Sequence, residues 1–91
     1  MCGIVGIARL GVTNILEKDR DVFVQMLSAG VVRGHHGTGV FAVDETGGAK
    51  LVKSAGPPYM LLVSEAFHKF WSELPSDKTR ILVGHNRFAT T

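Results

Sequence analysis

Apolar and polar residues follow different rhythms in successive stretches of the chain, and these rhythms predict its secondary structure. Two short runs rich in β-branched residues, 2–10 and 80–86, are each typical of a buried strand. Segments 40–44 and 49–54 flank the turn-forming sequence ETGG at 45–48, which predicts a β-hairpin.

Helical spacing of apolar residues marks two further segments. Segment 15–29 places Leu16, Phe23, Met26 and Leu27 on one face of a helix. Segment 59–74 carries a similar stripe, which we interpret as a helix packed on a sheet rather than as a cofactor site. Its members are Met60, Val63, Phe67, Phe70, Trp71 and Leu74. The order strand, helix, hairpin, helix, strand predicts a layered α/β or α+β domain.

Composition narrows the class of protein. A chain of 91 residues with 45% hydrophobic and 20% charged residues is typical of one small globular domain, covering 1–91. The sequence has no apolar run near the roughly 20 residues of a membrane span and no signal-peptide pattern, so we expect no membrane partner and a cytoplasmic location. The single cysteine fits a reducing compartment. A formal charge of +2, from scattered Lys and Arg, argues against nucleic acid as a partner.

Cys2, directly after the initiator methionine, is the first candidate for chemistry. If Met1 is removed, the thiol and a free α-amino group belong to one residue. The amine titrates near ~8, so it can act as the base that relays the thiol proton. The alternative is that Cys2 is a small buried residue in an edge strand.

Three motifs extend this candidate site: MCGIVG at 1–6, RGHHGTG at 33–39 and GHNRFATT at 84–91. Their combination and order resemble the class II glutamine amidotransferases, whose glutaminase domains use an N-terminal nucleophile (Ntn hydrolases). The resemblance spans the whole chain, and the last motif is the most specific of the three.

The resemblance implies an α+β fold of the Ntn type, a four-layer αββα sandwich, of which 1–91 is the N-terminal portion. It also implies that Cys2 attacks the side-chain amide of glutamine, forms a thioester and releases ammonia to a synthase domain or subunit. Glutamine and that synthase are the implied partners, and neither a cofactor nor a metal takes part. The oligomeric state stays open, a homo-oligomer included.

The same resemblance assigns roles around the nucleophile. Arg87 is expected to bind the glutamine α-carboxylate, because its planar guanidinium can donate two parallel hydrogen bonds. Thr90 supplies a hydroxyl to that carboxylate, or Thr91 does so in a shifted register. The remaining site residues are Phe88, whose main chain lines the pocket, and the supporting residues Arg33, Gly34 and His85.

Two departures from the family pattern leave alternatives open. His36 stands where the family has an aspartate, and together with His85 and Cys2 it allows a weaker reading as a metal site. The family's oxyanion hole lies downstream of the threonine motif, so we expect the isolated chain to be nearly inactive. The main alternative to the enzyme is a truncated, non-catalytic binding module that docks on another chain.

Overall fold

The computed structural model describes residues 3–9, 15–32, 35–74 and 78–88. Its elements follow one another in the order strand, helix, hairpin, two helices, strand. They are β1 (Gly3–Ala8), α1 (Glu17–Ala29), the 3₁₀ turn η1 (Gly30–Val32), β2 (Gly37–Asp44), β3 (Ala49–Ala55), α2 (Pro58–Leu62), α3 (Glu65–Glu73) and β4 (Thr79–Arg87).

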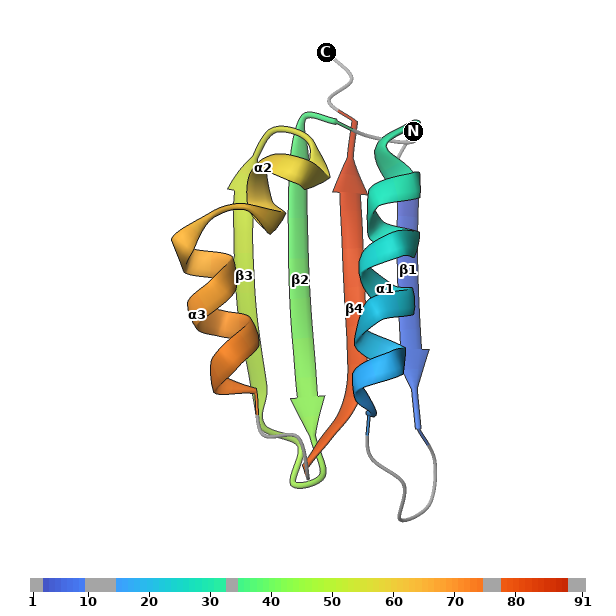
Figure 1. Ribbon diagram of the computed structural model, residues 1–91, viewed down its shortest axis with the longest axis vertical. Helices are drawn as coiled ribbons and strands as arrows, with labels where there is room; N and C mark the ends of the chain where they lie inside the picture. The colour runs from blue at the N-terminus through green and yellow to red at the C-terminus, as the bar shows by residue number, and fades with distance from the viewer. Residues whose placement is uncertain (1–2, 10–14, 33–34, 75–77, 89–91) are drawn as a thin grey trace.

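The four strands form one sheet in the order β1-β4-β2-β3, and every neighbouring pair is antiparallel. Figure 1 shows α1, α2 and α3 in front of the same face of this sheet. One row across the sheet, Gly6–Val83–Phe41–Leu51, fixes the register of all four strands. The described residues therefore form two layers, a helical layer and a sheet.

This architecture corrects the predicted fold class. The α+β content is as expected, but the four-layer αββα sandwich is wrong. The described residues contain a single sheet, and their helices cover only one of its faces. The sequence motifs indicate where residues lie along the strands. They do not show what packs against the sheet face opposite the helices, and this decides the number of layers.

The core lies between the helices and the sheet. Phe23 and Leu27 of α1 are fully buried, and they approach the backbone of β4 at Gly84 so closely that a Cβ there would lie 2.7 Å from Leu27 Cδ1. A glycine permits this helix to lie tightly against the strand. Asn86, also buried, donates a hydrogen bond from Nδ2 to the Leu27 carbonyl oxygen at 3.3 Å.

The predicted helix over 59–74 is two helices, because Ser64 interrupts it. The Ser64 hydroxyl oxygen accepts a hydrogen bond from the Phe67 N–H at 3.1 Å and donates one to the Leu61 carbonyl at 2.7 Å. A serine in this position is a typical helix N-cap. Pro58 begins α2 at a position where a missing N–H has no cost.

Polar contacts tie α1 to its neighbours. The Arg9 guanidinium donates two hydrogen bonds of 2.9 Å to Asp19, which links the residue after β1 to the first turn of α1. Arg20 lies over the Trp71 ring at 5.1 Å and donates to the Trp71 and Leu74 carbonyls, which links α1 to the end of α3. Among the described residues, each helix is too short or too polar to cross a membrane.

Candidate functional site

The sheet face that points away from the helices is the candidate functional surface, and we call it the open face. Side chains alternate between the two faces of a strand, so the register identifies its members. They are Ile4, Gly6 and Ala8 of β1, Gly37, Gly39, Phe41 and Val43 of β2, Ala49, Leu51, Lys53 and Ala55 of β3, and Ile81, Val83, His85 and Arg87 of β4.

Large apolar side chains on the open face reach solvent. Ile4 is 74% exposed, Leu51 62% and Phe41 39%. On the helix-covered face, the neighbours of Phe41 in the sequence, Val40 and Ala42, are buried, and Val5 and Val52 are partly buried against the core. The middle of the open face is therefore an apolar surface with no cover from the described residues.

A hollow of about 570 Å³ lies at one end of the open face. Phe41 and Leu51 form its apolar side, and Gly37 and Gly39 form part of its floor. A Cβ on Gly39 would lie 3.6 Å from the Lys53 Cβ, an ordinary contact distance. The glycines therefore deepen the hollow without being required by close packing.

The same hollow is bordered by Lys53, His85 and Arg87. The ion pairs within the described part of the chain are Arg9–Asp19 and Arg80–Glu45, and neither involves these groups. No aspartate or glutamate occupies an open-face position. This end of the open face thus combines apolar surface with positive charge, and no carboxylate among the described residues pairs with that charge.

A cluster of three rings adjoins the hollow. The centroids of His35 and His36 are 4.4 Å apart, and Phe88 lies 4.9 Å from His36 and 5.4 Å from His35. The His36 N–H donates to the Arg87 carbonyl at 3.0 Å, which joins the cluster to the end of β4. Aromatic residues, phenylalanine among them, are enriched in the buried cores of protein interfaces.

The structure divides the predicted site residues into two groups. Arg87 and His85 lie together on the open face, and Phe88 follows them beside the histidines. The others, Cys2, Arg33, Gly34, Thr90 and Thr91, lie outside the described residues. An arrangement of nucleophile, guanidinium and hydroxyl groups therefore stays a prediction.

The alternative of a metal site has a similar status. The described stretches contain no group of three or more His, Cys, Asp or Glu side chains placed to hold a metal ion. Cys2, which that alternative required, lies outside them.

The sequence motif GHNRF is split between the two faces of the sheet. His85 and Arg87 lie on the open face, whereas Gly84 and Asn86 pack under α1. Motif reasoning missed Leu51 and Lys53, which complete the hollow from β3. Their signal was present in the sequence: Leu51 and Lys53 are two residues apart in the predicted strand 49–54, so they lie on the same face of that strand.

Comparisons with known proteins show a fold and no family. No protein-family model and no curated protein matches the chain. A chain of the solved "Complex of beta-clamp processivity factor and little finger domain of PolIV" has a similar fold, with a TM-score of 0.63. The similarity covers 98% of this chain and 91% of that chain at 14% sequence identity, a level at which the fold alone is shared.

These findings overturn the resemblance to the class II glutamine amidotransferases. The fold is similar to a chain of a clamp–polymerase complex rather than to an Ntn hydrolase, and no amidotransferase family model matches. The predictions of an enzyme, of glutamine hydrolysis and of glutamine and a synthase as partners are therefore wrong. The prediction that nucleic acid is not a partner, which rested on the small net charge and on the scattered Lys and Arg, is not supported by these findings either.

Proposed function

We propose that this chain is a non-catalytic binding module that docks on another protein through the open face. The observation that carries the proposal is the exposure of Ile4, Phe41 and Leu51 on a sheet face that the described helices leave uncovered. Contiguous apolar surface on a folded domain commonly marks a site of interaction.

Burial of this surface supplies a physical driving force. Removing apolar surface from water contributes about 25 cal/mol per Å², or about 1.5–3 kcal/mol for a large side chain taken from full exposure to full burial. Leu51 has more of this to gain than Phe41, because more of it is exposed. Association also costs translational and rotational freedom, so several such side chains must be covered together.

The charged end of the open face defines the chemistry of the partner. Lys53 and Arg87 border the hollow without a carboxylate beside them, so we expect the partner to bring acidic groups next to an apolar side chain. A second copy of this chain does not meet that need, because its own open face carries no acidic residue. Nucleic acid would pair with the cations but leave the apolar middle exposed, which favours a protein.

The structural neighbour supports a docking role. The chain with the similar fold belongs to a complex between two proteins, so this fold does occur in a protein–protein assembly. We further propose that the module works in the cytoplasm, because its single cysteine suits a reducing compartment.

Site-specific photo-crosslinking tests the proposal. The photoreactive amino acid p-benzoylphenylalanine replaces Leu51 on the open face, or the exposed Lys18 on α1 as the matched control in the helical layer. We expect one dominant crosslinked protein from position 51 and none of it from position 18. The crosslinked protein is then purified and its affinity for the unmodified module is measured by calorimetry.

Variants decide whether that binding uses the open face. Leu51→Lys and Lys53→Glu should each weaken the affinity at least tenfold, and Lys18→Glu, on α1, should leave it unchanged. Equal binding by all three variants would overturn the proposal. Stronger binding of a duplex or single-stranded oligonucleotide than of the protein, lost in Lys53→Glu, would replace it with a nucleic-acid interface.

A further inference from the structure

The outer edge of β1 carries backbone groups that point away from the sheet. The Arg9 N–H donates to the Arg80 carbonyl at 2.9 Å, in the register that pairs Ala8 with Ile81. Hydrogen-bonded and non-hydrogen-bonded pairs alternate along an antiparallel ladder. The backbone groups of Val5 and Ile7 therefore face β4, and those of Ile4, Gly6 and Ala8 face outward.

This edge lacks the protection that the other edge has. Strand β1 (Gly3–Ala8) contains no charged residue and no proline, whereas β3, the strand at the opposite edge, carries Lys50 and Lys53. Charged side chains and prolines are the usual means by which edge strands avoid pairing with other chains. Strand β1 is therefore available to pair with a further strand, whereas the lysines of β3 disfavour such pairing at the other edge.

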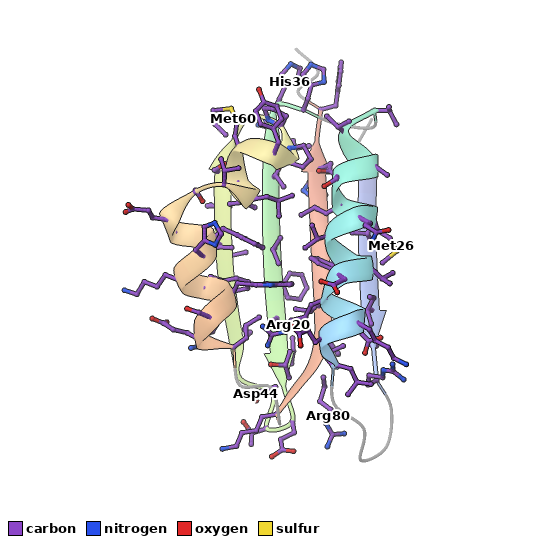
Figure 2. All side chains as sticks on the ribbon, in the orientation of Figure 1. Arg20, Met26, His36, Asp44, Met60 and Arg80 are labelled. Carbon is purple, nitrogen blue, oxygen red and sulfur yellow. The ribbon has the colours of Figure 1, made fainter. Side chains whose placement is uncertain are left out.

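The surroundings of the edge are apolar on both sides of the sheet. On the helical side, Met26 of α1 points past β1 and away from the middle of the sheet (Figure 2), and Val22, one turn earlier, is 48% exposed. On the open face, Ile4 is exposed beside Gly6, whose missing side chain leaves a bare position next to Val83. A glycine at an edge is often covered by an aromatic residue on the adjacent strand.

We propose that β1 accepts an extended segment of another protein as a fifth, antiparallel strand, with an aromatic side chain lying over Gly6. The outward backbone groups of Ile4, Gly6 and Ala8 supply the hydrogen bonds, and the bare position at Gly6 supplies the preference for one residue type. This contact is separate from docking on the open face and does not rest on it.

A second copy of the chain fits this edge poorly. Antiparallel self-pairing about Gly6 places glycine opposite glycine and Ile4 opposite Ala8, so each copy buries one large side chain on the open-face side. A stable interface generally buries about 1,200 Å² or more. A partner strand with larger side chains fills the space that self-pairing leaves empty.

Synthetic peptides provide the probe. The first is a capped peptide of alternating threonine and valine with a central phenylalanine and a lysine at each end; in the second, glycine replaces the phenylalanine. Amide hydrogen exchange of the full chain is followed by NMR. Without peptide, the amides of Ile4, Gly6 and Ala8 should exchange much faster than those of Val5 and Ile7. The phenylalanine peptide should slow the outward amides at least threefold and bind about fivefold more tightly than the glycine peptide.

Two controls locate the contact. N-methylation of the peptide amides that face β1 should abolish binding, and N-methylation of the alternate amides should leave it intact. Leu51→Lys should not affect the peptide although it weakens docking on the open face. The two proposals can therefore fail separately.

A variant at Gly6 tests the aromatic preference. Position 6 has room for the Cβ of the Gly6→Val variant, because that atom would lie 3.4 Å from the Leu82 carbonyl oxygen and 3.8 Å from Val83 Cγ2. This variant should reverse the preference, so that the glycine peptide binds at least as well as the phenylalanine peptide. Unchanged exchange of Ile4, Gly6 and Ala8 at saturating peptide overturns the proposal. Protection that rises with protein concentration and without peptide overturns it too, in favour of self-pairing.

Discussion

The two faces of the sheet use the same strands to opposite effect. On the covered face, Val40 and Leu82 have no exposed surface and pack under the helices; on the open face, their neighbours Phe41 and Val83 do not have that cover. One residue along the strand separates a core position from a surface position. The covered face therefore holds the fold together, and the open face is available for a partner.

The contrast also appears in the glycines. Gly84 lies where α1 approaches β4, so its missing side chain is needed for packing. Gly39, one strand away on the open face, has only ordinary contacts around its place for a Cβ. Residue type alone does not distinguish these two positions, but their faces do.

The largest expected difference comes from truncating one leucine on each side of the sheet. Leu82→Ala should lower the free energy of unfolding by about 2–5 kcal/mol, because it removes fully buried atoms and leaves a cavity. Leu51→Ala, on the open face, should cost less than about 1 kcal/mol. Urea denaturation of both variants makes the measurement. Equal decreases in the free energy of unfolding for Leu82→Ala and Leu51→Ala would show that the open face is part of the core.

A smaller effect is expected when a methyl group is added to a glycine. Gly84→Ala places a Cβ 2.7 Å from Leu27 Cδ1 and 3.0 Å from Phe23 Cζ, and such overpacking should cost about 1–3 kcal/mol. Gly39→Ala should be neutral or slightly stabilising, because alanine restricts the unfolded chain more than glycine does. Thermal unfolding of the pair tests this, and a stable Gly84→Ala variant would contradict the close packing of α1.

A charge on the open face should change the surface while leaving the fold nearly unaffected. Leu51→Lys should shift the free energy of unfolding by no more than about 0.5 kcal/mol. It should also lower the binding of an uncharged hydrophobic dye such as Nile red to the native chain. Dye fluorescence that is insensitive to Leu51→Lys but falls in Val22→Lys, on α1, would place the exposed apolar surface on the helical side.

The smallest expected effect is on the stability of the fold at acidic pH. The hydrogen bonds from Arg9 and from the Leu16 N–H hold the pKa of Asp19 below its usual value. A carboxyl whose pKa is lower in the folded state stabilises the fold above its unfolded pKa, near ~3.9, and loses this contribution as the pH falls through the folded pKa. Asp19→Asn should therefore flatten the decline of stability below about pH 4. Urea denaturation at several pH values checks this, and a parallel decline in both proteins would exclude the Arg9 contact as a cause.

The periodicity of apolar residues was sufficient to predict most of the helices and strands. The hairpin predicted over 40–54 is β2 and β3, and the helix predicted over 15–29 is α1, because in both cases local spacing coincides with local packing. It failed at Ser64, where a single side chain caps a new helix within a continuous apolar stripe. A stripe shows which side is buried, but it does not show whether the backbone is continuous.

The candidate site was harder to predict. Arg87 and His85 stood out as residue types within a motif, and they do share the open face. Leu51 and Lys53 come from a strand without any motif, and only the register of β3 on β2 brings them to the same hollow. The motif also suggested a family whose fold has a second sheet packed against the first, and the described residues contain one sheet only. The prediction failed there because a motif within one strand does not show what packs against the open face of the sheet.

The order of the sheet has a consequence for how the chain is made. Strand β4 is the neighbour of β1 although about 70 residues separate them in the sequence, and it also separates β1 from β2 in the sheet. While the ribosome synthesises the chain, β1 has no native partner strand until residues 79–87 have emerged. Pairing across such a long loop is slow and leaves a growing chain open to aggregation. Ribosome-associated chaperones that shield uncharged segments are therefore expected to contact the first strand throughout translation.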